Sequence, residues 1–167
     1  MKNIVFTLIL IINSLFANSY YLDEKIVEFP NDKEAGSIVI KTHDRKLYYI
    51  LDNWTAYEFP IAVGKKAKDR FYGVFPITAK AKWPSWRPTP SMLEKDPTLP
   101  EVVKGGRHNP LGARALYLGD SPFRIHGTNN PRSIGKFASH GCIRMYNKDV
   151  KELYKLTHKW DMVYVQR

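Results

Sequence analysis

The stretch that decides how this chain is interpreted spans residues 126–144 and reads HGTNNPRSIGKFASHGCIR. It holds two histidines and the only cysteine of the chain, Cys142. A cysteine nucleophile reacts as the thiolate and needs a neighbouring base to take its proton, a role open to His126 or His140. Gly141 carries no side chain, so backbone amides beside it can approach an oxyanion closely. The stretch therefore predicts a cysteine acyl-transfer site.

Two other roles for Cys142 stay open at the level of sequence. It can be a small buried apolar residue. Together with His126 and His140 it would also supply three ligands for a catalytic zinc ion. His140 and Cys142 are only two residues apart, however, and the chain has no pair of cysteines. The histidines and the glycine around the thiol favour acyl transfer without a metal or a cofactor.

The same stretch resembles the signature of the L,D-transpeptidase catalytic family, often called the YkuD family. The family pattern has a His-Gly-Thr element, here residues 126–128. A Ser-His-Gly-Cys element follows, then an apolar residue and Arg or Asn, here residues 139–144. Residues 109–112 and 115–118 are similar to the family segment before the catalytic strand. The resemblance covers roughly residues 37–165, which is nearly the whole chain after its first segment.

The resemblance implies a role for each residue of the motif. Cys142 would attack the donor peptide and form a thioester, and His126 would be the general base, oriented by a backbone carbonyl. The amides of Gly141 and Cys142 would form the oxyanion hole. Ser139, His140 and Arg144 would shape the site and contact substrate. The bond cleaved would join the diamino acid of a tetrapeptide stem to the terminal D-alanine, and an amine would take the acyl group to give a 3-3 crosslink.

The acceptor of the acyl group is left open by the sequence. Water in place of the amine would make the enzyme an L,D-carboxypeptidase. A lysine of an outer-membrane protein would make it an enzyme that anchors a protein to peptidoglycan. A noncatalytic wall-binding module belongs to a different class, and it would not need a base, a thiol and oxyanion glycines together. The implied partners are therefore peptidoglycan stem peptides and, in one alternative, a wall-anchored protein.

The first 19 residues are typical of a secretory signal peptide. Lys2 gives a positive start, residues 4–12 are almost wholly apolar, and small residues follow at Ala17 and Ser19. The apolar run is short for a membrane span of roughly 20 residues, which disfavours an uncleaved anchor. Cleavage after either small residue is compatible with the pattern. We therefore expect an exported protein of the periplasm or cell envelope that is not an integral membrane protein after cleavage.

The chain carries a formal net charge of +10. Its basic residues are scattered, with no arginine-rich arm and no nucleic-acid-binding motif, so nucleic acid is not the expected partner. An exported basic protein is better matched to an anionic polymer such as peptidoglycan, whose stem peptides carry carboxylates. A charged, soluble surface without a specific partner is the alternative.

After a polar linker or leading segment at residues 20–36, the pattern predicts one β-rich catalytic domain over residues 37–167. Strands are expected where β-branched and aromatic residues gather. A helix is expected from Asn147, as its N-cap, because apolar residues repeat at helical spacing over residues 150–157. The expected strands lie at 37–41, 47–51, 57–63, 73–82, 115–118, 123–126 and 162–165. The fold class is thus mainly β, a mixed sandwich or barrel-like domain with one clear α-helix near the C-terminus.

A long Pro-rich stretch at residues 83–112 separates the expected strands. A loop of this length in a compact domain usually has a function. Trp83 and Trp86 lie at its start, and we expect Trp86 to contact substrate where the loop lines the cleft that holds Cys142. The alternative is that these aromatic rings pin the loop to the core.

Overall fold

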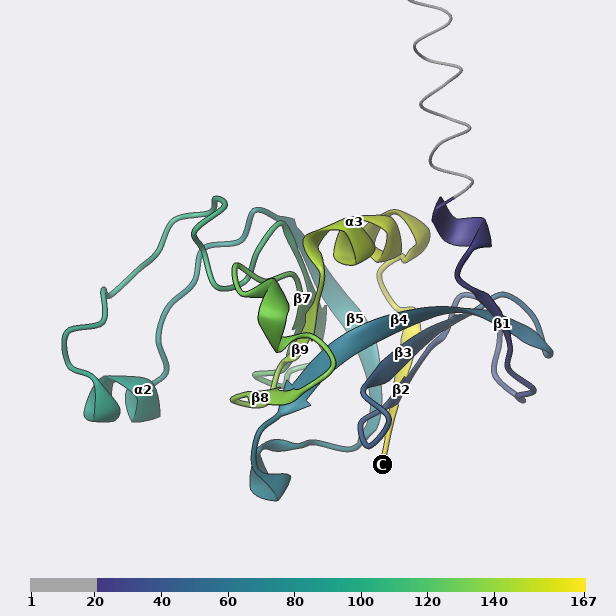
Figure 1. The fold of residues 1–167 in the computed structure, drawn as a ribbon, viewed down its shortest axis with the longest axis horizontal. Coiled ribbons are helices and arrows are strands. Elements are labelled where there is room, and N and C mark those ends of the chain that lie inside the picture. The colour runs from purple at the N-terminus through teal and green to yellow at the C-terminus, as the bar shows by residue number, and fades with distance from the viewer. Residues whose placement is uncertain (1–20) are drawn as a thin grey trace, which may run out of the picture.

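The computed structural model describes residues 21–167 (Figure 1). The predicted signal peptide lies outside these residues. Within them, no helix is both long and apolar enough to cross a membrane. The elements follow in the order β1 (Ile26–Glu28), β2 (Ile38–Lys41), β3 (Lys46–Ile50), β4 (Thr55–Gly64), η1 (Ala67–Asp69), β5 (Gly73–Lys82), α2 (Pro90–Lys95), β6 (Arg114–Leu118), β7 (Arg124–His126), η2 (Pro131–Ser133), β8 (Phe137–Ser139), β9 (Ile143–Met145), α3 (Asn147–Leu156) and β10 (Met162–Gln166).

The strands close into a barrel because β4 pairs at both of its edges. Along the sheet the order is β4-β3-β2-β10-β5-β6-β7-β9, and β9 returns to pair with the end of β4. Most neighbours are antiparallel, but β10 runs parallel to β2, and β7 runs parallel to β9. The prediction of a mainly β, barrel-like fold is confirmed, and all seven strands expected from the sequence are present.

The core fills the inside of this barrel with branched and aromatic side chains. Ile38 and Ile40 of β2 point inward and belong to one core cluster with Leu47 of β3 and Phe59 of β4. Each of these side chains is fully buried. The period of two along a strand explains why alternate residues share this face. Helix α3 lies across one end of the strands in Figure 1 and contributes Val150 and Leu153 to the same core.

Four features differ from the sequence-based expectations. Helix α2 lies within residues 83–112, which were expected to be an irregular loop. Strand β1 lies inside the segment predicted as a linker, where it pairs antiparallel with β4 and attaches the segment to the barrel. Strands β8 and β9, in residues 137–145, were not expected, because each has three residues and is too short to show alternation. The prediction that Asn147 is the helix N-cap is wrong. Tyr146 occupies that position, and the Asn147 side chain bonds to other segments of the chain.

Candidate active site

Strand pairing brings the two ends of the 126–144 stretch together. His126 ends β7, Ser139 ends β8, and Cys142 directly precedes β9. The parallel register of β7 and β9 sets Ile125 opposite Ile143 and His126 opposite Arg144. The histidine therefore lies beside the residues that follow the cysteine, although many residues separate the two in sequence.

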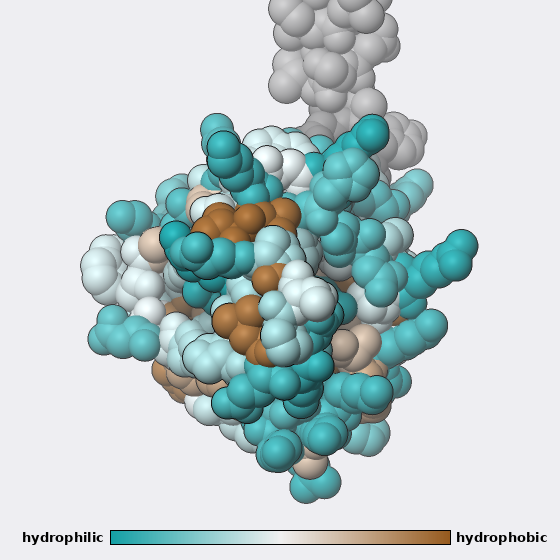
Figure 2. Space-filling model, turned by 90° about the vertical axis from the view of Figure 1, so that its left-hand side faces the viewer, coloured by the Kyte–Doolittle hydropathy of each residue, from teal (hydrophilic) through white to brown (hydrophobic). Residues whose placement is uncertain are grey.

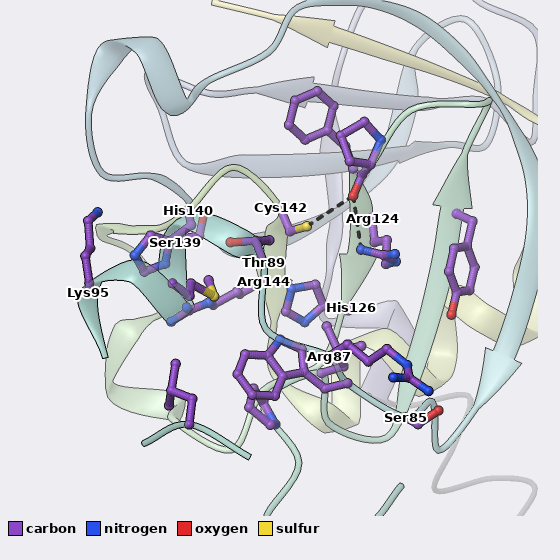
Figure 3. A pocket seen from close by; sticks show the side chains of 18 residues that line it. Ser85, Arg87, Thr89, Lys95, Arg124, His126, Ser139, His140, Cys142 and Arg144 are labelled. Carbon is purple, nitrogen blue, oxygen red and sulfur yellow. Dashed lines mark hydrogen bonds between the residues drawn. The ribbon is translucent and has the colours of Figure 1, made fainter. Parts of the chain in front are cut away.

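A pocket of about 760 Å³ opens at this point. Figure 3 shows Cys142, His126, His140 and Arg144 around it. Figure 2 views the molecule from the side on which α2 lies, where apolar patches are surrounded by hydrophilic residues. The lining residues come from the 83–112 loop, from β6 and β7 and from the 139–144 motif: Ser85, Trp86, Arg87, Thr89, Met92, Lys95, Leu99, Pro110, Leu111, Tyr117, Pro122, Phe123, Arg124, His126, Ser139, His140, Cys142 and Arg144.

His126 is held as a neutral imidazole with a defined tautomer. Its ring Nδ1 lies 2.5 Å from the carbonyl oxygen of Gly127. A carbonyl oxygen only accepts hydrogen bonds, so Nδ1 carries the proton and Nε2 of the neutral ring is unprotonated. The ring is only 4% exposed. This burial is the main reason that the pKa of His126 falls to about 4, and the positive charges of Arg144 and Arg124 lower it further. The residue therefore has the protonation state of a base at neutral pH.

Cys142 lies partly exposed with its thiol near a backbone carbonyl. Its Sγ is 3.9 Å from the oxygen of Pro122, the distance of a weak S–H donor to an acceptor. Removal from water raises the pKa of the Cys142 thiol above its usual range, whereas the backbone N–H of Arg124 and then the charges of Arg124 and Arg144 lower it. The thiol is thus the favoured form at rest, and nearby cations oppose the effect of burial.

Gly141 and Ser139 are tied to each other directly before the cysteine. Gly141 adopts φ of +131°, a conformation that side chains disfavour, and an added Cβ would lie 3.0 Å from a ring carbon of Phe123. Its N–H donates to Ser139 Oγ over 3.1 Å, and Ser139 is buried. The amide that the resemblance assigns to the oxyanion hole therefore already has a hydrogen-bond partner in this structure.

The remaining motif residues differ in how far they are covered. His140 is exposed at the pocket rim, whereas Arg144 is half-buried. Burial lowers the pKa of Arg144, and Cys142 opposes this effect. Within residues 21–167 no group of three or more His, Cys, Asp and Glu is arranged to hold a metal ion.

The 83–112 loop is built as an ordered wall of the pocket. Trp86 lines the pocket and pairs with Val103 through two backbone hydrogen bonds of 2.9 and 2.8 Å. Buried Asn109 joins the loop stems, because its Nδ2 donates to the carbonyls of Pro84 and Val103 and its Oδ1 accepts from the Leu111 N–H. The Trp86 ring thus faces the space shared with Cys142, whereas Trp83 is not among the lining residues.

Comparison with known proteins shows the family of this chain. Residues 35–165 match the YkuD family, described as the L,D-transpeptidase catalytic domain. The chain belongs to this family. ErfK/SrfK of Escherichia coli K12, named a probable L,D-transpeptidase, is 35% identical over 130 residues, which are 75% of this chain and 42% of that protein. YbiS of the same strain, also named a probable L,D-transpeptidase, is 34% identical over 131 residues, with the same two coverages.

A solved structure of L,D-transpeptidase 3 from Mycobacterium tuberculosis has the same fold. It superposes with a TM-score of 0.64 at 15% identity, covering 80% of this chain and 61% of that one. At this identity the likeness concerns the fold alone. This chain spans less than half the length of the two Escherichia coli relatives.

The L,D-transpeptidase domain also contains site residues that the sequence analysis missed. Lys95 and Arg124 are the missed residues. They join Arg144 and Arg87 on the pocket wall, and Arg87 was expected from the sequence to offer its charge to stem-peptide carboxylates. The lining residues of the described chain include no Asp or Glu. Arg124 lies two positions before His126 on β7, so the two side chains leave the same face of the strand. That spacing was the one available signal for Arg124. Nothing in the sequence pattern marked Lys95.

Proposed function

We propose that this chain is an exported cysteine L,D-transpeptidase that acts on the tetrapeptide stems of peptidoglycan, with Cys142 as nucleophile and His126 as base. The observation that carries the proposal is that the thiol and a neutral imidazole line one pocket, with His126 Nδ1–H fixed on the Gly127 carbonyl. A general base needs an unprotonated nitrogen, and this arrangement reserves Nε2 for that task.

The first half of the reaction forms the thioester. The Cys142 proton passes to His126 Nε2, and Sγ bonds to the carbonyl carbon of the diamino acid. The oxygen of the tetrahedral intermediate becomes negative and needs N–H donors, for which the amides of Cys142 and Gly141 are the candidates. Use of the Gly141 N–H requires it to leave Ser139 Oγ. Collapse then breaks the C–N bond, and D-alanine leaves with the proton held by His126.

The second half returns the enzyme to its starting state. An acceptor amine gives its proton to His126, attacks the thioester carbon and forms a new amide bond. Sγ leaves as the thiolate and takes back the proton. An amine from another stem gives a 3-3 crosslink.

Recognition of the stem rests on the positive wall of the pocket. Arg144 and Arg124 lie beside the thiol, and guanidinium groups bind carboxylates through paired hydrogen bonds. Stem peptides carry carboxylates on D-alanine and on the diamino acid. We further propose that Ser139 and His140 shape the site and that Trp86 contacts the stem, with residues 1–19 directing export to the periplasm or envelope.

The test is incubation of the protein with purified tetrapeptide muropeptides, followed by mass spectrometry of the products. We expect a crosslinked dimer with loss of D-alanine from wild type and no product from Cys142→Ala. Circular dichroism must show the same fold for both proteins. Turnover by a folded Cys142→Ala variant would refute the role of the thiol.

The same assay separates the other acceptors. A tripeptide without dimer identifies water as acceptor and the enzyme as an L,D-carboxypeptidase. Addition of a lysine-bearing peptide, and a product joined through that lysine, identifies an anchoring enzyme. Binding of muropeptides without any product supports a noncatalytic wall-binding module.

A further inference from the structure

One backbone carbonyl holds both the thiol and an arginine that the sequence motif does not include. The Pro122 oxygen accepts a hydrogen bond from Arg124 Nη1 at 3.0 Å, and the Sγ of Cys142 lies 3.9 Å from the same atom (Figure 3). A carbonyl oxygen accepts from a neutral S–H but repels a thiolate. When Cys142 loses its proton, the favourable neighbour changes from the Pro122 oxygen to the cation already bound to it.

Arg124 is fixed in place without an acid to neutralise it. Its guanidinium carbon lies 5.0 Å from the centroid of the Tyr117 ring, and its Nη1 is held by Pro122. Within residues 21–167 it forms no salt bridge, and its buried Nε has no hydrogen-bond partner. A buried donor without a partner destabilises the fold. The positive charge is therefore left available to the pocket.

His126 is poorly suited to be the only counter-charge of a thiolate. Burial holds its pKa at about 4, so the protonated ring is disfavoured at neutral pH. An arginine remains charged at every working pH. The backbone N–H of Arg124 lowers the pKa of the thiol most, and the Arg124 guanidinium lowers it more than Arg144 does.

We propose that Arg124 stabilises the thiolate of Cys142 and thereby sets the pH at which this thiol becomes reactive. The inference rests on the proposed role of Cys142 as nucleophile. In the step concerned, the S–H bond breaks, its electron pair stays on sulfur, and the proton passes to His126 Nε2 or to water. Arg124 keeps all of its protons throughout.

The experiment measures the pH dependence of Cys142 alkylation by iodoacetamide. Sulfur displaces iodide, and intact mass reports a single site because the chain has one cysteine. In Arg124→Gln the apparent pKa of the thiol should rise by about one unit, which lowers the alkylation rate below that pKa about tenfold. Arg124→Lys should show a smaller rise. Arg132→Gln, the same charge change at an exposed residue outside the pocket, should leave the profile unchanged.

A second readout reports the local charge directly. Iodoacetate is negative and iodoacetamide is neutral. The rate of alkylation by iodoacetate divided by the rate with iodoacetamide therefore measures the electrostatic potential at the sulfur. The ratio should fall several-fold in Arg124→Gln and stay constant in Arg132→Gln. A folded Arg124→Gln with the wild-type profile and ratio would show that Arg124 only supports the Pro122 loop. That result would overturn the proposal.

Two further outcomes keep the test decisive. Should Arg124→Gln fail to fold, Arg124→Lys retains the charge. A rise of the thiol pKa by less than about half a unit then supports the proposal, and a larger rise overturns it. Failure of the proposed function has a separate signature, because it appears as muropeptide turnover by Cys142→Ala and not in alkylation rates.

Discussion

Asn147 connects three segments near His126, and we expect the stability loss on its removal to be coupled to that of substituting the neighbouring Gly127. Its Oδ1 accepts from the N–H groups of Ala113 and Thr128 at 2.9 and 3.3 Å, and its Nδ2 donates to the Thr128 carbonyl at 2.8 Å. A Cβ on Gly127 would lie 2.1 Å from the same Oδ1. The glycine therefore leaves the space that the amide occupies, directly beside the carbonyl that orients His126.

The expected magnitudes follow from these contacts. Asn147→Ala removes three hydrogen bonds of about 1 kcal/mol each, and water replaces part of them, so the free energy of unfolding should fall by about 2–3 kcal/mol. Gly127→Ala must displace the amide and should destabilise by a similar amount. In the double variant the amide is already gone, so the added Cβ displaces nothing. The double variant should therefore lose about 2 kcal/mol less free energy of unfolding than the sum of the two single losses.

Urea unfolding of the four proteins, wild type included, measures this coupling. Each single variant should melt about 5–10 °C lower than wild type, at roughly 2–4 °C per kcal/mol. Lys151→Ala, an exposed position on α3, is the matched control and should stay within about 0.5 kcal/mol. Single losses that add to the double loss within about 0.5 kcal/mol would refute the argument that Gly127 makes room for Asn147.

Three further predictions concern the site itself. Burial lowers the pKa of His126 to about 4, whereas the pKa of a histidine in the unfolded chain is near 6.5. As the pH falls, the unfolded state therefore binds the proton first. The folded state loses stability through this pH range. On going from pH 7 to 5, wild type should lose about 2 kcal/mol more than His126→Gln in urea unfolding, and equal losses would contradict the assignment. His126→Ala should abolish muropeptide turnover nearly as fully as Cys142→Ala, whereas His140→Ala at the exposed rim should reduce it less, and the reverse ranking would exchange their roles. Trp86→Ala should raise the apparent KM for muropeptides and leave iodoacetamide alkylation of Cys142 nearly unchanged; a large loss of thermal stability with unchanged kinetics would instead assign the ring to loop packing.

Much of this fold follows from local pattern. The runs of β-branched and aromatic residues form β2 and β3, and the apolar repeat at residues 150–157 forms α3. These elements are predictable because the periods of strands and helices show in residues close together in the sequence. The Cys142 motif and the long loop of residues 83–112 were likewise visible in the sequence. Composition and a short motif were sufficient to predict a mainly β domain with a cysteine site.

The arrangement of the site was decided by contacts between distant segments. The parallel register of β7 and β9, which sets His126 opposite Arg144, is a pairing choice that no local period encodes. The role of Asn147 was hidden for the same reason, since its amide bonds to backbone on other segments instead of capping its own helix. Arg124 and the thiol meet at the carbonyl of Pro122, which contacts both. The sequence by itself determined which chemical groups are present, and only the closure of the barrel decided which of them meet, because strand pairing and buried hydrogen bonds join residues far apart along the chain.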